Sequence, residues 1–288
     1  MDYMANADII IYTDNMTQID AAPLSLQKSW NIRGVSWSKI ANSGASDGVL
    51  LKAIERINDT DYYLKLSNYD SYRGFFGHES VNELIACRLG KLLGFGVPDG
   101  FLKKALVKVE GVEYETYVFA VESYKSTNSR ISFEEYYKSN RLTAKESPLD
   151  FCKRNGWAAD IYMMFVFDYL IINRDRHGAN LEVLKNSKKK LSPLFDNGLS
   201  FLCTNTDTSG VSDFDALLDR PVNNFIGERS LELNLSYIDL GLAFNELTGI
   251  HKPFLFSGLD GILNQVYYDK IWEILTLRWE HVKGFRVA

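Results

Sequence analysis

Cysteine is scarce in this sequence, and no two cysteines stand close enough together to form a metal-binding pair. The 288 residues include only Cys87, Cys152 and Cys203, and none belongs to a C-x-x-C motif. Such spacing provides neither a disulfide framework nor a zinc knuckle and is typical of a reducing compartment. The four histidines are equally dispersed. We therefore expect a cytoplasmic protein without a dedicated metal cage of cysteines and histidines.

Long apolar runs are also missing. The longest, over residues 161–172, is interrupted by Asp168 and is shorter than the roughly 20 residues that a membrane-spanning helix needs. Near the amino terminus, the apolar run at residues 9–12 is too short for the core of a secretory signal. These patterns predict a soluble protein with no membrane segment and no targeting signal.

Neither sign of charge dominates the chain. Its 32 lysine and arginine residues stand against 37 aspartate and glutamate residues, which argues against nucleic-acid binding through bulk positive charge. One basic segment, residues 185–190, is either a local nucleic-acid contact or a solvated hairpin tip, and we favour the tip. Aromatic residues make up 13% of the chain and there are only six prolines, so disorder is excluded as the main state.

The order of predicted elements changes near the middle of the chain. In the first part, apolar or alternating runs predict strands over residues 9–12, 49–54 and 62–66. Apolar residues spaced by three and four predict a helix over residues 79–93 that ends at Gly94. A hairpin follows, with strands over residues 102–109 and 114–121 joined at Glu110-Gly111.

Beyond residue 123 the patterns are mainly helical. Helices are predicted over residues 132–140, 151–172, 237–248, 259–266 and 269–282, and a short strand pair over residues 181–184 and 194–195. A strand-rich part with one helix, followed by a helical part, predicts an α+β fold with two lobes and a cleft between them. We place the boundary within residues 122–127, which gives one lobe over residues 1–122 and a second over residues 123–288.

Two polar motifs stand in a fixed order in the second lobe. Asp175 and Asn180 are separated by four residues, the D-x-x-x-x-N spacing of a kinase catalytic loop, in which the aspartate accepts a proton and the asparagine binds magnesium. Asp196 follows in Leu194-Phe195-Asp196-Asn197-Gly198, the place of the metal-binding aspartate of D-F-G. Each motif alone is better explained by chance or by an ordinary turn. Together they predict a phosphoryl-transfer site in which Asn180 and Asp196 share magnesium ions.

A phosphoryl-transfer site also needs a fixed cation for the phosphates. Lys65 lies between apolar residues on a predicted strand, as in the V-A-I-K element, although taken alone it is more simply an exposed strand lysine. Glu83 on the predicted helix is its candidate partner, and Glu79, one turn earlier, is the alternative. Residues 41–48 precede a strand and are a candidate phosphate loop; they do not match G-x-G-x-x-G, and a plain surface turn is the simpler interpretation.

Other reaction classes lack their motifs. The sequence contains no G-x-S-x-G, H-E-x-x-H or G-x-x-x-x-G-K-[ST] element. His177 is a candidate base, but no serine or cysteine in a nucleophile context accompanies it. Hydrolysis through a serine or cysteine nucleophile is therefore not predicted.

The motifs together resemble the HipA-like serine/threonine kinases, whose catalytic core is related to the phosphatidylinositol 3/4-kinases. The resemblance covers about residues 42–200 and is carried by the segments 43–48, 63–66, 82–99, 120–124 and 173–180 together with 192–196. It implies a protein-kinase-like fold, in which ATP lies between a strand-rich amino-terminal lobe and a helical carboxy-terminal lobe.

The resemblance also implies a role for each site residue. Asp175 is expected to be the catalytic base, and Asn180 and Asp196 are expected to bind magnesium. The residues expected to contact ATP are Ser43, Gly44, Ala45, Ser46, Lys65, Glu83, Glu122, Tyr124, His177, Asn180, Phe195 and Asp196.

Within that set, Lys65 is expected to contact the α- and β-phosphates with support from Glu83. Backbone groups of Glu122 and Tyr124 are expected to hold the adenine. Phe195 is expected to line the nucleotide pocket.

The chain departs from the family pattern in its phosphate loop. Typical members have a glutamine and a lysine where this chain has Ser46 and Gly48. At these two positions the resemblance therefore leaves open how the loop contacts ATP. We also expect the chain to lack the additional amino-terminal subdomain of longer members, which places it nearer the short, stand-alone ones.

These observations predict an ATP- and magnesium-dependent kinase that phosphorylates serine or threonine hydroxyls of a protein. The alternatives are a lipid or small-molecule kinase of the same fold and a non-catalytic, nucleotide-binding pseudokinase. The sequence has no amphipathic basic helix, which argues against a lipid acceptor. The expected partner is a protein substrate rather than a nucleic acid, and an antitoxin-like regulator remains a candidate partner.

Overall fold

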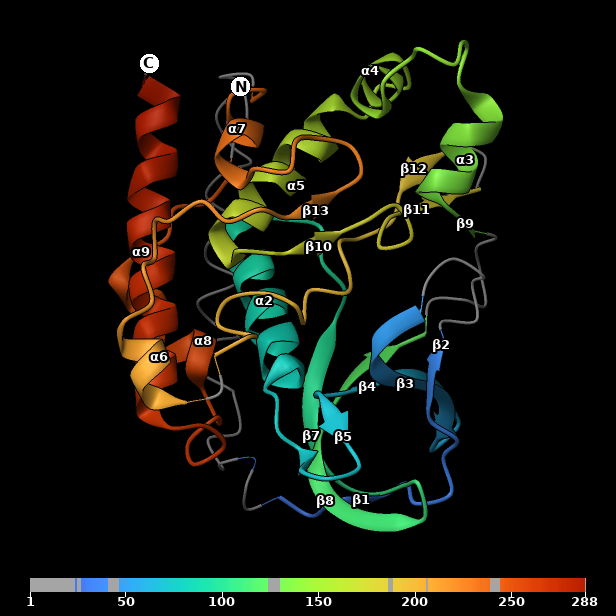
Figure 1. The fold of residues 1–288 in the computed structure, drawn as a ribbon, viewed down its shortest axis with the longest axis vertical. Helices are drawn as coiled ribbons and strands as arrows, with labels where there is room; N and C mark the ends of the chain where they lie inside the picture. Colours follow the sequence, from blue (N-terminus) through green and yellow to red (C-terminus); the bar gives the residue numbers. More distant parts are fainter. Residues whose placement is uncertain are drawn as a thin grey trace, which may run out of the picture.

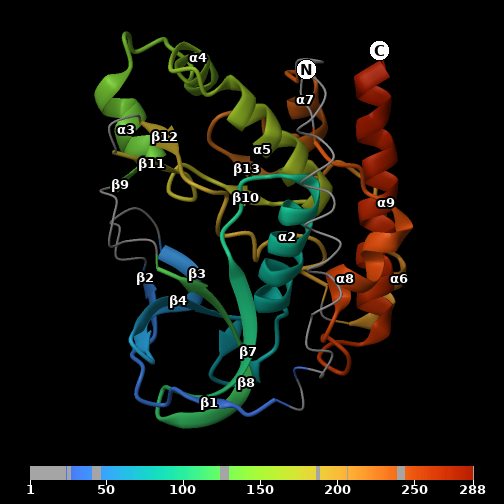
Figure 2. The same cartoon turned by 180° about the vertical axis from the view of Figure 1, so that it is seen from behind.

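The protein combines a twisted sheet with a group of helices, as Figures 1 and 2 show from opposite sides. The computed structural model describes residues 24, 27–40, 47–123, 130–185, 189–205, 207–238 and 244–287. The sheet belongs to the amino-terminal part of the chain and most helices to the carboxy-terminal part. Helix α2 (Glu79–Leu93) lies between them (Figure 1). The predicted α+β fold is confirmed.

The main sheet has six strands in the order β1-β7-β8-β4-β3-β2. Neighbouring strands are antiparallel except β1 and β7, which are parallel. The strands are β1 (Trp30–Asn31), β2 (Ser38–Ile40), β3 (Asp47–Ile57), β4 (Thr60–Leu66), β7 (Gly100–Val109) and β8 (Val112–Glu122). A two-stranded ribbon of β5 (Tyr69–Asp70) and β6 (Gly74–Phe75) precedes α2.

Two-residue turns fix the register of the two long hairpins. The turn Asn58-Asp59 joins β3 to β4 with φ angles of 49° and 66°, and Glu110-Gly111 joins β7 to β8 with φ angles of 50° and 85°. Positive φ at both turn residues is the type I′ pattern, whose twist matches that of the flanking strands. The predicted hairpin is confirmed, and in the other hairpin Lys52 lies directly opposite Lys65.

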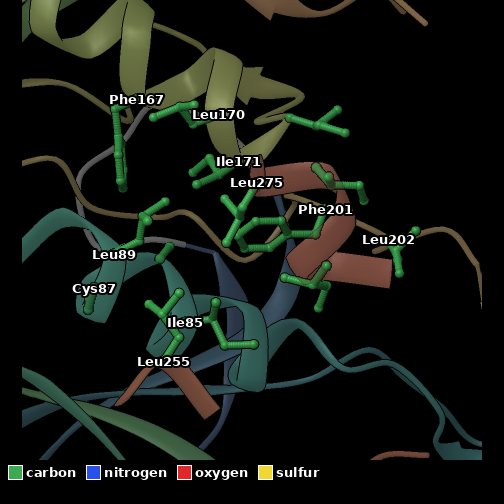
Figure 3. Packing of buried hydrophobic residues seen from close by; sticks show 14 of the residues in the cluster. Ile85, Cys87, Leu89, Phe167, Leu170, Ile171, Phe201, Leu202, Leu255 and Leu275 are labelled. Atoms are coloured by element: carbon green, nitrogen blue, oxygen red, sulfur yellow. The ribbon is translucent and has the colours of Figure 1, made fainter. Parts of the chain in front are cut away.

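Helix α2 has the predicted bounds. It ends at Gly94, whose φ of 81° is a left-handed conformation that glycine adopts without steric cost. Its apolar face packs into a core that it shares with α5 (Ala158–Ile171), α8 (Lys252–Phe256) and α9 (Gln265–Val287), part of which Figure 3 shows. The labelled residues of this core are Ile85, Cys87, Leu89, Phe167, Leu170, Ile171, Phe201, Leu202, Leu255 and Leu275.

The carboxy-terminal part contains the remaining helices and five short strands. The helices are α3 (Phe133–Asn140), α4 (Pro148–Arg154), α5, α6 (Thr208–Ser212), α7 (Leu231–Leu235), the 3-10 helix η3 (Gly249–His251), α8 (Lys252–Phe256) and α9 (Gln265–Val287). The strands are β9 (Arg130–Ser132), β10 (Asp175–Arg176), β11 (Glu182–Leu184), β12 (Lys190–Leu191) and β13 (Asn223–Asn224). No helix of the described ranges is long and apolar enough to cross a membrane.

Two predictions for the region around the motifs are wrong. The single helix predicted over residues 151–172 is two helices, α4 and α5, because the chain turns at Gly156, which has a φ of 76°. The strand predicted over residues 194–195 is irregular, since β11 pairs with Lys190–Leu191 instead. The segment that carries Asp196 is therefore a loop held by side chains.

Predictions nearer the carboxy terminus have mixed outcomes. The helix predicted over residues 269–282 is confirmed within α9. The helix predicted over residues 259–266 is wrong over residues 259–264, because Gly258 and Gly261, with φ angles of 72° and 75°, form turns between α8 and α9, and residues 265–266 belong to α9. Of the helix predicted over residues 237–248, residues 244–248 are not helical and residues 239–243 lie outside the described residues, as does the strand predicted over residues 9–12.

The three cysteines are free and buried. Burial raises the pKa of the Cys152 thiol to about 12 and that of the Cys203 thiol to about 11. Both thiols are therefore protonated and unreactive at neutral pH. The prediction that the cysteines form no disulfide framework is confirmed.

Candidate active site

Four charged side chains from four separate segments meet at one point, and we call them the lysine–carboxylate cluster. Lys65 Nζ on β4 lies 2.6 Å from Glu83 Oε1 on α2 and 3.0 Å from Asp196 Oδ1 in the loop after β12. Lys52 Nζ on β3 lies 2.7 Å from the other oxygen of Asp196, Oδ2. Each oxygen of Asp196 thus accepts a hydrogen bond from a different ammonium group.

Lys65 and Asp196 hold each other in their charged forms. Burial by itself lowers the pKa of Lys65, but the nearby carboxylates of Asp196 and Glu83 outweigh it and leave the pKa above its usual range. Burial by itself raises the pKa of Asp196, but the ammonium groups of Lys65 and Lys52 outweigh it and hold that pKa well below its usual range. Both side chains are therefore ionised at neutral pH.

Helix α2 holds the loop that carries Asp196. Glu83 Oε2 accepts a hydrogen bond from the Asn197 backbone N–H at 3.0 Å. The adjacent Asn82 donates from Nδ2 to the carbonyl oxygens of Gly198 at 3.1 Å and Ser200 at 2.9 Å. Asn82 and Glu83 are both buried. Two neighbouring residues of one helix thus fix the path of the loop.

The carboxylate of Asp175 is oriented from both sides. Its Oδ1 accepts a hydrogen bond from Asn223 Nδ2 at 3.0 Å, and its Oδ2 lies 3.5 Å from His177 Nε2. His177 Nδ1 accepts the backbone N–H of Ala179 at 3.1 Å, so in the neutral ring the proton is on Nε2 and faces Asp175.

Asn180 closes the same loop onto Asp175. Its Nδ2 donates to the Asp175 carbonyl at 2.7 Å, and its backbone N–H donates to the His177 carbonyl at 2.9 Å. Because Nδ2 is the donor, the side-chain oxygen Oδ1 points away from this bond and is available as a ligand. Figures 1 and 2 both show β10, which carries Asp175, between α5 and the main sheet.

Arg176 joins the Asp175 loop to the Asp196 loop. It forms a buried pair with Asp168 of α5, with Nη2 2.7 Å from Oδ1 and Nε 3.1 Å from Oδ2. It also donates to the Phe195 carbonyl and to Asn197 Oδ1, each at 2.7 Å. Arg176 and Asp168 are each 1% exposed, so this pair is part of the interior. One guanidinium group therefore fixes the two motif loops relative to each other.

The structure thus brings the predicted residues together in two groups that Arg176 connects. Lys65, Glu83 and Asp196 form the first group, and Asp175, His177 and Asn180 form the second. Phe195 lies between them through its carbonyl.

Three predicted positions stand apart from these groups. Glu79, the alternative partner of Lys65, instead accepts the backbone N–H of Asn68 at 3.0 Å. Glu122 is exposed at the end of β8, opposite Tyr62. Lys185 follows β11 at the end of the described range, and residues 186–188 lie outside it. The remaining predicted residues outside the described residues are Ser43, Gly44, Ala45, Ser46 and Tyr124.

The sequence interpretation missed Lys52 and gave Arg176 no role. Lys52 had a usable signal: counting outward from the turn Asn58-Asp59 places it opposite Lys65, on the same face of the hairpin. Arg176 had only a weak signal, an arginine inside the polar motif, since its partner Asp168 lies in an apolar helix.

The oxygen donors of the site fit magnesium. Asp196 offers a carboxylate that already attracts two cationic groups, and Asn180 offers an amide oxygen, which are the hard ligands magnesium prefers. Among the residues that the structure describes, no group of three or more histidine, cysteine, aspartate or glutamate side chains is arranged to hold a metal. Magnesium commonly binds one or two protein oxygens together with substrate phosphates and water. The donor set therefore fits a magnesium–nucleotide complex better than a metal held by protein alone.

Comparisons with known proteins support the kinase-like fold. No protein-family model and no curated protein matches the sequence. The crystal structure of the Helicobacter pylori proinflammatory kinase CtkA is similar, with a TM-score of 0.58 and 14% sequence identity over 90% of this chain and 97% of that chain. The HipA chain from a Shewanella oneidensis HipA–HipB–operator DNA complex has a TM-score of 0.43 and 14% identity over 97% of this chain and 72% of that chain, a likeness too low to carry an argument. The similarity to CtkA shows that this chain has a kinase-like fold.

Proposed function

We propose that this protein is an ATP- and magnesium-dependent kinase that transfers the γ-phosphate of ATP to a serine or threonine hydroxyl of a protein. The observation that carries the proposal is the lysine–carboxylate cluster, in which Asp196 is joined through Arg176 to the loop of Asp175 and Asn180. The kinase-like fold supports the same reaction class.

The chain's own residues would act mainly by positioning and by neutralising charge, which is what phosphoryl transfer requires. Lys65, held by Glu83, would contact the α- and β-phosphates. Asn180 and Asp196 would hold magnesium, which neutralises phosphate charge when bound. Asp175 would orient the acceptor hydroxyl and take its proton as the bond from that oxygen to the γ-phosphorus forms and the bond to the β-phosphate oxygen breaks.

His177 would position the catalytic carboxylate. Its Nε2–H faces Asp175 Oδ2, and the Asn223 amide holds the other oxygen. Together the two contacts would orient the carboxylate toward an acceptor hydroxyl, as a general base requires. The adenine contacts of Glu122 and Tyr124, and the phosphate contacts of residues 43–46, belong to the proposal through the family resemblance.

Transfer of labelled γ-phosphate from ATP tests the proposal. The wild type and Asp196→Asn are incubated with magnesium and three acceptors: the protein itself, generic protein substrates, and phosphoinositide vesicles. Asp260→Asn, an exposed aspartate between α8 and α9, is the matched control. We expect label on protein with the wild type and the control, and its loss with Asp196→Asn. Label on lipid alone would identify a lipid kinase of the same fold, and bound ATP without any transfer would identify a pseudokinase.

A further inference from the structure

We propose that Lys52 is a second phosphate-binding lysine, paired with Asp196 in the nucleotide-free protein and in contact with the polyphosphate once magnesium binds Asp196. This inference rests on the proposed function and adds to it a residue that no sequence motif identified. It concerns the affinity for nucleotide phosphates, so it can fail while the proposed function stands.

The position of Lys52 lowers the stability of the folded protein unless a negatively charged group lies near its ammonium group. Lys52 and Lys65 are direct cross-strand neighbours on β3 and β4, so their side chains project from the same face of the sheet. Like charges directly opposite each other destabilise a strand pair. The two side chains are also only 23% and 13% exposed, so water solvates them incompletely. Asp196 offsets this cost by giving one oxygen to each lysine.

Magnesium binding to Asp196 would remove that compensation. The cluster contains two ammonium groups, Lys52 and Lys65, and two carboxylates, Glu83 and Asp196. Glu83 bonds Lys65 but not Lys52. When Asp196 binds a metal ion, that ion neutralises the negative charge of its carboxylate. Lys65 then still has Glu83 as an anionic partner, whereas Lys52 has lost the carboxylate with which it was paired.

The polyphosphate is the anion that would replace Asp196 as the partner of Lys52. In a magnesium–nucleotide complex the phosphates and the carboxylate bind the same ion. The phosphate oxygens would therefore lie next to the Asp196 carboxylate, within reach of Lys52. A lysine ammonium is a flexible point charge with three donors and can follow this change by rotation of its side chain. Lys52 would thus contribute to binding in proportion to the phosphates that a ligand carries.

Calorimetric titration of the full chain tests this role. The ligands are magnesium–ATP, magnesium–ADP and adenosine; the proteins are the wild type, Lys52→Met, Lys52→Arg and the control Lys108→Met, an exposed lysine of β7. We expect Lys52→Met to weaken ATP binding about tenfold, the size of a lost charged hydrogen bond, and to weaken ADP binding as well. Adenosine binding should not change, Lys52→Arg should retain most of the affinity, and Lys108→Met should match the wild type.

Two outcomes would overturn the inference while leaving the proposed function intact. Equal or tighter ATP binding by Lys52→Met would show that Lys52 only neutralises Asp196. An equal loss for ATP and adenosine would show that the substitution disturbs the site as a whole. Failure of the wild type to bind magnesium–ATP would instead overturn the proposed function and this inference with it.

Discussion

At the scale of single residues, Glu83 has two separate tasks in the candidate site. Its Oε1 accepts a hydrogen bond from Lys65, and its Oε2 accepts the backbone N–H of Asn197 next to Asp196. Asp196 itself has a φ of 60°, a left-handed conformation that costs a residue with a side chain about 1–3 kcal/mol. The contacts of Glu83 therefore hold both a cation and a strained segment of backbone.

Glu83→Ala should lower the free energy of unfolding by about 3 kcal/mol, because it leaves a buried ammonium group with one anion fewer and a buried N–H without an acceptor. Urea unfolding of the wild type, Glu83→Ala and the surface control Glu280→Ala measures this effect. Glu280 is exposed on α9, so its substitution should change the stability little. Equal stabilities of the two variants would contradict the role given to Glu83.

Lys52 shows how a residue-level prediction can follow from sequence alone. The hairpin β3–β4 has a two-residue turn, and once that turn is recognised the register places Lys52 beside Lys65. The pair Arg176–Asp168 cannot be predicted by counting along the sequence, because the packing of α5 against the loop brings the two residues together. Local geometry can be counted along the chain, whereas these buried polar contacts depend on tertiary structure.

At the scale of elements, the first turn of α2 contains two buried titratable groups. His78 is 4% exposed, and its Nε2 is buried without a partner among the described residues. Burial lowers the pKa of His78 to about 4 and raises the pKa of the adjacent Glu79. The environment at the start of this helix therefore stabilises the neutral form of His78.

Acidification should destabilise the protein through His78. The ordinary pKa of histidine is 6.5, so between about pH 6.5 and 4 the unfolded chain binds a proton that the native His78 does not. Stability therefore falls as the pH falls through this window, by up to about 3 kcal/mol in total. Glu79 acts in the opposite direction, because its raised pKa lets the native state take up a proton above the usual pH for a glutamate.

Urea unfolding at a series of pH values measures this dependence. We expect the free energy of unfolding of His78→Gln to decrease less below pH 6.5 than that of the wild type. His251→Gln, which changes a partly exposed histidine, should show most of the wild-type decrease. An unchanged pH dependence in His78→Gln would show that other groups cause the acid sensitivity.

The elements differ in how far the sequence predicts them. Helix α2 and the hairpins followed from apolar spacing and from turn residues, which act over a few positions. The division of α4 from α5 was missed because one helix was predicted across the polar residues 153–155 and Gly156, where the chain turns. The loop of Asp196 was mistaken for a strand because side chains from α2 and β10 determine its path.

At the scale of the whole molecule, one of the three hydrophobic clusters among the described residues contains residues of both lobes. Buried residues of α2 belong to the same cluster as residues of α5, α8 and α9 (Figure 3). Arg88 of α2 also donates from Nη1 to the carbonyl oxygens of Leu255 and Ser257, each at 2.9 Å, and Asn245 Nδ2 donates to the Leu92 carbonyl at 2.9 Å. Helix α2 therefore packs both on strands β7 and β8 of the sheet and on the carboxy-terminal helices.

Because of this shared core, we expect the lobes to unfold together. Residue-resolved hydrogen exchange should give the same opening free energy for the slowest amides of β8 in the sheet and of α9 in the helical part. A distinctly lower value for one of the two elements would show that its lobe unfolds independently.

Phosphate transfer by Asp175→Asn, measured together with ATP binding on the same preparations, tests the proposed kinase chemistry most directly. The substitution removes the proton acceptor but keeps the size of the side chain and leaves the lysine–carboxylate cluster intact. We predict that transfer falls by about 10²–10⁴-fold while the affinity for magnesium–ATP stays close to that of the wild type, with Asp260→Asn as the unaffected control. Undiminished transfer by Asp175→Asn, or loss of transfer and ATP binding together, would contradict the assignment of Asp175 as the catalytic base.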